Sequence, residues 1–321
     1  MRIVITGALG HIGSRLIRDL PLVFANSEIV MLDDLSTQRF CSLFDLPAEA
    51  KYRFIEADVL TTDLVPIFKG ANAVIHLAAI TDAPSSFAKK DLVERVNFAG
   101  TEKVARACAE AGCPLVFPST TSVYGSQAEI VDENCPISDL KPQSPYADSK
   151  LKAEQVLQAL GETEELRFVI CRFGTIFGVS PGMRFHTAIN KFCWQAIMKK
   201  PITVWRTAMN QNRPYLDLVD AIESIKFIID RELYSRSIYN IVTINTSVSR
   251  IIEIIRLHLR DLSVQYVDNE IMNQLSYHVD SARVRNLGFE FTGDLERGIG
   301  DTIRLLRQTG NFNSNNKLIT G

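Results

Sequence analysis

The chain has 321 residues, 46% of them hydrophobic and 22% charged, with 35 Lys and Arg against 37 Asp and Glu. This composition is typical of a globular protein large enough for one α/β unit with a smaller companion domain. A net charge of -2 excludes a sequence-wide basic field, so we expect neither a nucleic-acid partner nor attraction to an acidic membrane surface.

The remaining composition indicates a reduced protein that is not anchored in a membrane. No apolar run approaches ~18 residues, and the first residues lack the layout of a signal peptide. The six cysteines have no metal-ligand spacing, so the sequence predicts neither a disulfide framework nor a metal site. We therefore expect a cytoplasmic location.

The chain opens with a strand pattern, a glycine turn and a helix pattern. Residues 2–6 are a short β-rich run, and residues 14–20 have helical periodicity. The glycine spacing between them is GxxGxxG and not GxGxxG, and such glycines can also be plain turn formers. In this context they let the backbone approach a pyrophosphate at the helix N-terminus. The expected cofactor contacts are Gly7, Gly10, His11, Ile12 and Gly13.

A second strand pattern, residues 28–32, ends in Asp33. A carboxylate at that point accepts hydrogen bonds from the adenosine ribose and repels a 2′-phosphate. Asp34 follows, and the next arginine is Arg39. We therefore predict NAD and not NADP as the cofactor, with Asp33 and Asp34 near its adenosine end. The alternative is an aspartate that only begins a turn.

Strand and helix patterns continue to alternate up to about residue 173. The further strand patterns are 52–57, 73–77, 114–118 and 167–173, and the longest helix pattern is 92–111. Such alternation predicts a parallel sheet covered by helices on both faces, with ligands at the carboxyl ends of the strands. The expected fold class is α/β: a Rossmann-type doubly wound parallel sheet with a smaller C-terminal α/β substrate domain.

Two polar stretches follow the fifth strand pattern. Residues 119–125 carry a hydroxyl cluster that either closes a turn or presents a hydroxyl to a substrate oxygen. Further on, Ser144 can cap a helix beginning at Pro145, which places Tyr146 and Lys150 one turn apart on the same face. A nearby ammonium favours the phenolate, so Tyr146 would be a base whose pKa Lys150 lowers. Pairs at this spacing also occur on ordinary solvated helix faces.

Nine segments share an order that runs from residue 3 to about residue 220, with weaker similarity to about residue 307. They are Gly7-x-x-Gly10-x-x-Gly13, Asp33, Asp58-Val59, His76-Leu77-Ala78-Ala79, Asn97-x-x-Gly100-Thr101, Ser119-Thr120-x-x-Val123-Tyr124-Gly125, Ser144-Pro145-Tyr146-x-x-x-Lys150, Arg172-Phe173-x-x-Ile176-Phe177-Gly178 and Arg213-Pro214-Tyr215-x-x-x-x-Asp220. Together they resemble the extended short-chain dehydrogenase/reductase family, close to NAD-dependent nucleotide-sugar epimerases of the UDP-glucose 4-epimerase type.

The resemblance implies redox chemistry at carbon 4 of a nucleotide-linked sugar. Tyr146 would exchange the proton of the sugar hydroxyl, Lys150 would lower the pKa of Tyr146 and bond the nicotinamide ribose, and Thr120 would share the hydrogen bond to the reacting oxygen. Further cofactor contacts are implied for Asp58, Val59, Leu77, Ala78, Ala79 and Asn97.

The residues after Thr120 disfavour two related reactions. Related 4,6-dehydratases have an Asp-Glu pair directly after the catalytic Thr, and related decarboxylases have Glu at the second of these positions. This chain has Thr121 and Ser122 there, and neither is a useful general acid or base.

The substrate end departs from the family pattern. Thr175 stands where many epimerases have an Asn that contacts the sugar nucleotide, and the segment around it is similar to a subgroup with TVFGxSPxMRF. Arg213 resembles an arginine that meets the nucleotide diphosphate, although it could also lie on a solvated loop. A second diphosphate arginine is missing at residues 273–276, and its candidates are Arg184 and Arg283. The candidate substrate contacts are Thr81, Ser122, Thr175, Arg184, Asn190, Arg213 and Arg283, with Asn190 in a helix pattern at 183–199.

We expect an NAD-binding domain at 1–177 with a returning segment near 213–243, a mainly substrate-binding domain at 178–310, and a flexible tail at 311–321. Relatives usually form homodimers through a four-helix bundle made by the helices at 92–111 and after Ser144. The apolar helix positions that fit such a bundle fit ordinary core packing as well: Ala99, Ala105, Ala109, Ala153, Val156, Leu157 and Leu160.

The leading hypothesis from the sequence is an NAD-dependent 4-epimerase that acts on a nucleotide-diphosphate sugar, with a UDP-sugar favoured. The first alternative is a 4-dehydrogenase or 4-ketoreductase on a GDP-linked or other NDP-linked sugar. The second is a regulator that senses NAD without catalysis, against which the Thr120, Tyr146 and Lys150 set speaks.

Overall fold

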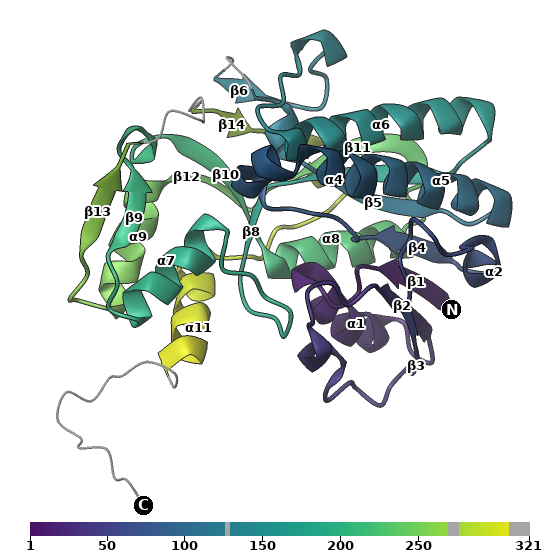
Figure 1. The fold of residues 1–321 in the computed structure, drawn as a ribbon, viewed down its shortest axis with the longest axis horizontal. Coiled ribbons are helices and arrows are strands. Elements are labelled where there is room, and N and C mark those ends of the chain that lie inside the picture. Colours follow the sequence, from purple (N-terminus) through teal and green to yellow (C-terminus); the bar gives the residue numbers. More distant parts are fainter. Residues whose placement is uncertain (126–128, 269–275, 308–321) are drawn as a thin grey trace, which may run out of the picture.

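A seven-stranded parallel sheet forms the larger lobe (Figure 1). The computed structural model describes residues 1–125, 129–268 and 276–307. The strand order is β3-β2-β1-β4-β5-β7-β11, which is the doubly wound Rossmann arrangement. The strands are β1 (Arg2–Thr6), β2 (Glu28–Asp33), β3 (Lys51–Glu56), β4 (Ala73–His76), β5 (Leu115–Thr120), β7 (Phe168–Phe173) and β11 (Ser235–Ile241). The predicted fold class is therefore confirmed.

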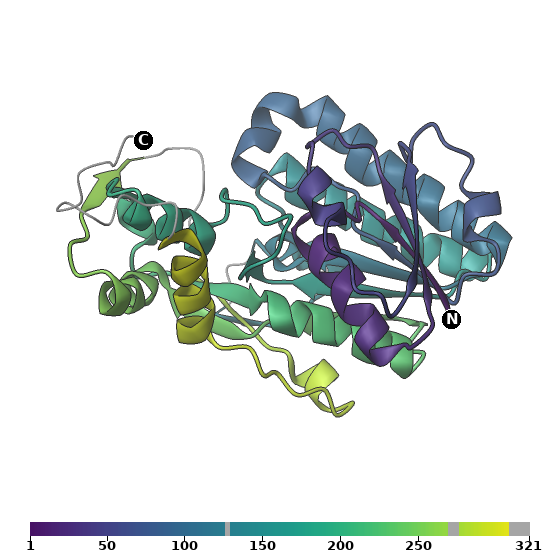
Figure 2. The ribbon, with the colours of Figure 1, turned by 90° about the horizontal axis from the view of Figure 1, so that it is seen from below.

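Helices cover both faces of this sheet (Figure 2). One face carries α1 (His11–Val23) and α8 (Leu218–Asp230), and the other carries α2 (Val65–Phe68), α5 (Gly100–Ala111) and α6 (Pro145–Thr163). Because both faces are buried, strand residues such as Ile3, Val4 and Ile5 are apolar in an unbroken run and have no exposed area. The carboxyl ends of the strands are left as the edge at which a ligand can bind.

The smaller lobe has its own apolar core, centred on Phe177, Ile251 and Ile299. Its strands are β8 (Thr175–Phe177), β10 (Asn212–Asp217) and β12 (Ile244–Ser247) in one sheet, with β9 (Ile202–Trp205) paired to β13 (Val264–Val267). Its helices are α7 (Ala188–Ile197), α9 (Val248–His258) and α11 (Leu295–Arg307). Residues 284 and 289 return to the core of the large sheet, so the chain crosses between the two lobes more than once.

The remaining elements are short. They are the strand pair β6 (Ile130–Val131) and β14 (His278–Val279), the helices α3 (Ala83–Ser86), α4 (Lys90–Val93) and α10 (Ala282–Arg285), the 3-10 turns at Phe40–Leu43, Phe87–Lys89, Thr121–Val123, Ile137–Asp139 and Arg206–Ala208, and a π-helical segment at Glu94–Ala99. Within the ranges that the structure describes, no helix combines the length and the apolar character needed to cross a membrane.

Two helix predictions differ from the structure. The helix expected at 92–111 is interrupted by the π-helical segment Glu94–Ala99, whose Asn97 turns inward to bond the backbone of Ile80. The helix expected at 183–199 begins only at Ala188. Residues 178–187 are instead held against the glycine turn, where the amide of Gly182 donates to the hydroxyl of Ser14 at 2.9 Å.

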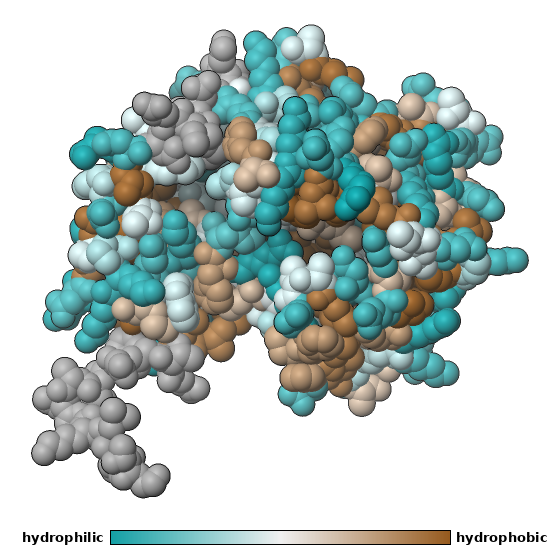
Figure 3. Space-filling model, in the orientation of Figure 1, coloured by the Kyte–Doolittle hydropathy of each residue, from teal (hydrophilic) through white to brown (hydrophobic). Residues whose placement is uncertain are grey.

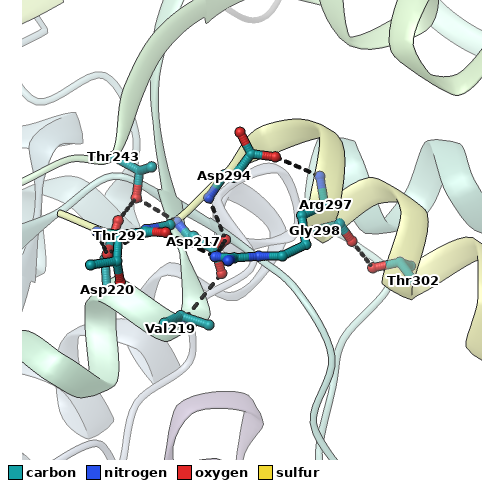
Figure 4. Close-up of polar contacts among 10 residues, drawn as sticks. Asp217, Val219, Asp220, Thr243, Thr292, Asp294, Arg297, Gly298 and Thr302 are labelled. Atoms are coloured by element: carbon teal, nitrogen blue, oxygen red, sulfur yellow. Dashed lines mark hydrogen bonds and ion pairs between the residues drawn. The ribbon is translucent and has the colours of Figure 1, made fainter.

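Two buried aspartates attach the C-terminal segment to the β10–α8 corner (Figure 4). Asp220 accepts hydrogen bonds from the amides of Thr292 and Gly293, both at 2.8 Å, and from the hydroxyl of Thr243 at 2.5 Å. Asp217 accepts from the amide of Asp294 at 3.0 Å. These contacts pair the amides of the three residues that precede α11 (Leu295–Arg307) and hold the start of this helix at the corner.

The apolar positions considered for a dimer interface mostly face the subunit's own core. Ala105, Ala153 and Leu157 have no exposed area, and Leu160 is 4% exposed. These four side chains pack between the sheet and the helices α5 and α6. Ordinary core packing, which the sequence left open, is therefore their role within the subunit. The predicted flexible tail at 311–321 lies outside the described residues.

Candidate active site

A cavity of about 620 Å³ lies at the carboxyl ends of the sheet strands, a size in the range of ligand pockets. The space-filling view shows the face of the molecule hollowed near its middle, with apolar side chains set back among hydrophilic ones (Figure 3). Most of the predicted site residues line this cavity: Gly7, Gly10, His11, Ile12, Gly13, Asp33, Asp34, Asp58, Val59, Leu77, Ala78, Ala79, Thr81, Thr120, Ser122, Tyr146, Lys150, Thr175 and Arg184.

The glycine turn between β1 and α1 leaves no room for side chains. Gly7 has φ +66°, and a Cβ on it would lie 2.5 Å from the amide nitrogen of Ala78. A Cβ on Gly13 would lie 2.5 Å from the carbonyl oxygen of Ala8. No side chain caps α1 and its first turn has no acidic residue, so its N-terminus is suited to a phosphate group.

Asp33, at the end of β2, lines the cavity beside the glycine turn. Its carboxylate accepts hydrogen bonds from the amides of Leu9, at 3.0 Å, and Leu35, at 3.1 Å. Burial raises its pKa, while these two hydrogen bonds and the charge of Arg39 lower it. The backbone thus fixes the carboxylate and leaves further lone pairs for a diol.

The helix that carries Tyr146 begins as predicted. The hydroxyl of Ser144 accepts a hydrogen bond from the amide of Ala147 at 3.1 Å, and Pro145 occupies the first turn. Lys150 is 4% exposed, and its Nζ donates to the carbonyl oxygen of Pro118 at 2.9 Å. The ammonium also lies 4.4 Å from the centroid of the Phe117 ring.

The electrostatics of this pair differ from the prediction. Burial raises the pKa of Tyr146, and the groups that lower it are the hydroxyl of Thr120, by a hydrogen bond, and the charge of Arg184. Lys150 is not among the causes, because its ammonium is directed to Pro118 on β5. Burial lowers the pKa of Lys150 to about 7, against the raising effect of Glu154.

A buried ion pair lies behind Lys150 on the same helix face. Glu154 and Arg172 are each 3% exposed, and they are joined at 2.7 Å. Glu154 also accepts a hydrogen bond of 2.5 Å from the hydroxyl of Ser119. This network connects α6 to β5 and β7, and it supplies the negative charge nearest to the Lys150 ammonium.

Asn97 and His76 make buried hydrogen bonds that hold the wall of the cavity. Asn97 has no exposed area and bonds both the amide and the carbonyl of Ile80 as well as the hydroxyl of Ser149, so it lies behind the wall rather than in it. His76 pairs with Thr6 at 2.7 Å and Thr101 at 3.1 Å. Burial lowers the pKa of His76 to about 3, which keeps its imidazole neutral.

Three predicted substrate residues lie outside the cavity lining. Asn190 is fully buried, and its amide group bonds the backbone of Gly178 and Arg184. Arg213 lies near the ring of Tyr277, at 5.9 Å from its centroid. Arg283 donates to the carbonyl of Ile238 and to the side chain of Asn134 at the outer end of the sheet. Arg184 is thus the one of the two arginine candidates that reaches the cavity.

The carboxylates that line the described cavity are Asp33, Asp34 and Asp58, and all three lie at the carboxyl ends of β2 and β3. At the opposite end, Thr121 is 2% exposed and its hydroxyl donates to the carbonyl of Phe173. Ser122 lines the cavity and donates its amide to Oγ1 of Thr120. Among the described residues, no group of His, Cys, Asp and Glu side chains is arranged to hold a metal ion.

Sequence reasoning missed the segment that closes over the glycine turn. The hydroxyl of Ser180 donates to the carbonyl of His11 at 2.8 Å, and the imidazole of His11 contacts the carbonyl of Gly178 at 2.9 Å. These partners lie more than 160 positions apart, so no local pattern could indicate the contact. The segment gives the cavity a wall from the smaller lobe.

Comparison with known proteins agrees with this fold. A family model described as "NAD dependent epimerase/dehydratase family" matches residues 3–241, and the chain belongs to this family. It is an extended short-chain dehydrogenase/reductase, and NAD is its cofactor. A Bacillus subtilis protein, described as the uncharacterized UDP-glucose epimerase YtcB, is 30% identical over 240 residues, which are 72% of this chain and 73% of the relative.

Other relatives include both epimerases and dehydratases. The UDP-glucuronic acid 4-epimerase of Bacillus cereus, solved with UDP-glucuronic acid and NAD, is 25% identical with a TM-score of 0.83 and covers 96% of this chain and 100% of its own. The dTDP-glucose 4,6-dehydratase DesIV of Streptomyces venezuelae, solved with NAD, is 25% identical with a TM-score of 0.83, covering 96% and 97%. This chain spans 46% of a trifunctional Arabidopsis thaliana enzyme to which it is 28% identical.

Proposed function

We propose that this protein is an NAD-dependent nucleotide-sugar epimerase that inverts carbon 4 by transient oxidation, with a UDP-sugar as the favoured substrate. The observation that carries the proposal is the end of the cavity around Tyr146. It presents a phenol and hydroxyls, while the carboxylates of the described lining lie at the β2 and β3 end. A 4,6-dehydratase needs acid and base groups at the sugar end, and the residues there are Thr121 and Ser122.

The residues fit NAD and a proton-transfer step. The glycine turn admits a diphosphate and Asp33 admits a ribose diol. When bound, NAD would accept the hydride from the sugar carbon and return it to the other face. Tyr146 takes the proton of the 4-hydroxyl and gives it back, and the hydroxyl of Thr120 holds the reacting oxygen beside it. Lys150 lies at the wall of this cavity, is directed by the carbonyl of Pro118, and adds a positive charge there in its protonated form.

On the substrate side, Thr81, Ser122 and Thr175 lie in the cavity lining and would contact the sugar nucleotide. Thr175 is exposed within this wall and is the first residue of β8, with one residue between it and the end of β7. Its hydroxyl is shorter than the amide found at that position in many relatives, which would alter the choice of sugar. We also propose that Arg213, on β10 beside Tyr277, contacts the nucleotide diphosphate.

The assembly and the location are part of the same proposal. We infer a cytoplasmic homodimer in which the outer surfaces of α5 and α6 meet their counterparts in a four-helix bundle. Helices α5 and α6 pack beside each other on one face of the large sheet, which supports this arrangement. Size-exclusion chromatography with light scattering tests the dimer.

The activity is tested by incubating the protein with UDP-linked and GDP-linked sugars while product stereochemistry and NADH absorbance are followed. Epimer without net NADH supports a 4-epimerase. Accumulation of NADH with a keto sugar supports a 4-dehydrogenase on that sugar, and neither product over a broad panel supports an NAD-sensing regulator.

The Tyr146→Phe variant tests the role of the phenol. It removes the proton donor and acceptor without changing the packing of the ring, so turnover should fall by at least about 10²-fold while NADH binding stays within about twofold. Thr163→Val, at the far end of the same helix, is the control. Full activity in Tyr146→Phe would end the proposal.

A further inference from the structure

The segment 178–187 brings an arginine over the glycine turn. Gly182 lies against the turn so closely that a Cβ on it would be 2.3 Å from the carbonyl oxygen of Leu9 and 2.6 Å from that of Gly10. With the hydrogen bonds of Gly182 and Ser180 to the α1 end, this approach fixes the course of the segment. Arg184 follows two residues later, and its guanidinium enters the cavity.

Arg184 has hydrogen-bonding capacity that the protein itself does not use. Its terminal nitrogen donates to the hydroxyl of Thr81, but its buried Nε has no partner among the described residues. Within the described ranges, no carboxylate forms an ion pair with it. A buried donor that stays unpaired is costly unless a ligand supplies the acceptor.

A second guanidinium lies near the first. Arg39 donates to the carbonyl of Gly182 at 3.0 Å, and its positive charge lowers the pKa of Arg184, after the larger effect of burial. Two like charges held near each other in a partly buried site repel, and an anion between or beside them relieves the repulsion. The pair therefore indicates a ligand with strong negative charge.

The position of Arg184 identifies which anion this is. Its charge acts on Tyr146, where the reacting carbon would lie, and the charge of Asp33, at the adenosine end, acts on Arg184. Arg184 thus lies between the two ends of the dinucleotide site. The diphosphate is the middle of an extended dinucleotide, and the uncapped N-terminus of α1 lies at the same place.

We propose that Arg184 binds the diphosphate of NAD, and not that of the sugar nucleotide, from the side opposite the N-terminus of α1. Arg39 supports it with a second positive charge and holds the segment through Gly182. The smaller lobe thereby contributes directly to cofactor binding. This inference requires NAD binding only, and it stands or falls separately from the sugar chemistry.

Equilibrium binding of NADH, ADP-ribose, adenosine and UDP to the purified chain tests the proposal. Arg184→Gln should weaken NADH and ADP-ribose binding by about 10- to 100-fold, the effect of a lost charge-assisted contact to phosphate. Adenosine, which has no diphosphate, should bind within about twofold of the wild type. Arg184→Lys, which keeps the charge and loses the planar fork, should lie between the two.

Arg283→Gln is the matched control, because its guanidinium lies outside the cavity on Asn134 and Ile238. Thermal melting of each variant without nucleotide separates loss of fold from loss of binding. Weaker UDP binding with unchanged NADH binding in Arg184→Gln would assign the arginine to the substrate and overturn the proposal. Unchanged binding of all four ligands would also overturn it.

Discussion

The ammonium group of Lys150 is buried, and burial disfavours its charged form. Replacement of Lys150 by Met should therefore make the protein more stable while abolishing its activity. The side chain is 4% exposed and lies over the ring of Phe117. Burial lowers its pKa from 10.5 to about 7. This difference corresponds to about 5 kcal/mol of unfavourable free energy for the charged form in the folded state.

The effect has a defined dependence on pH. The unfolded chain holds the Lys150 proton up to about pH 10.5, whereas the folded chain releases it near pH 7. The unfolded state therefore binds more protons between these values, so the contribution of Lys150 to stability rises as the pH rises through this window. Met removes this cost but also removes the hydrogen bond to Pro118, worth about 1.5–3 kcal/mol. The net gain should be about 2–3 kcal/mol at pH 7 and should vanish at about pH 9, because the remaining cost of the charge falls by about 1.4 kcal/mol per pH unit.

Urea unfolding of wild type and Lys150→Met, followed by circular dichroism between pH 6.5 and 10, measures this gain. Lys152→Met is the matched control on the same helix, because Lys152 is 41% exposed and pairs with Glu94 and Asp148 at the surface. That variant should change the unfolding free energy by less than about 1 kcal/mol at every pH. A Lys150→Met variant less stable than the wild type by a constant amount across the whole pH range would refute the reasoning.

Two further substitutions test the buried charges. Glu154→Gln leaves Arg172 without its counter-charge, so the unfolding free energy should fall by about 3–5 kcal/mol. Because Glu154 raises the pKa of Lys150, the loss of kcat at alkaline pH should move to lower pH in this variant. An unchanged pH profile of kcat would contradict the effect of Glu154 on Lys150. Asp220→Ala leaves the amides of Thr292 and Gly293 without this partner, so hydrogen exchange in α11 should become faster than in the wild type while exchange in β1 stays unchanged. Equal protection of α11 in the variant and the wild type would show that Asp220 does not anchor this helix.

The sequence by itself determined the elements that depend on local pattern. Apolar runs alternating with helical periodicity predicted a doubly wound parallel sheet, and this fold class was confirmed. Ser144 and Pro145 gave the start of the helix, and the spacing of four placed Tyr146 and Lys150 on one face. These features could be predicted because turn, cap and period act within a few residues of each other.

The tertiary structure decided what those residues experience. Lys150 is directed to Pro118 and not to Tyr146, because the fold places a carbonyl of β5, 32 positions earlier in the chain, within 2.9 Å of its ammonium. Burial then sets its pKa, and no local pattern reports burial. Arg184 was one of two candidates for a second diphosphate arginine, whereas its neighbours Thr81 and Arg39 lie in loops after β4 and β2, far away in the chain.

The segment 178–187 shows most clearly what local sequence patterns could not predict. The sequence predicted a helix from residue 183, yet contacts with Ser14 and His11 hold the segment as turns and bends over the glycine turn until Ala188. Tertiary hydrogen bonds outweighed a propensity worth a few tenths of a kcal/mol per residue. The sequence therefore predicted the glycine turn, Asp33 and the Tyr146 helix, because each depends on residues that lie close together in the chain. The wall that completes their cavity was set only by contacts between residues that are remote in the chain.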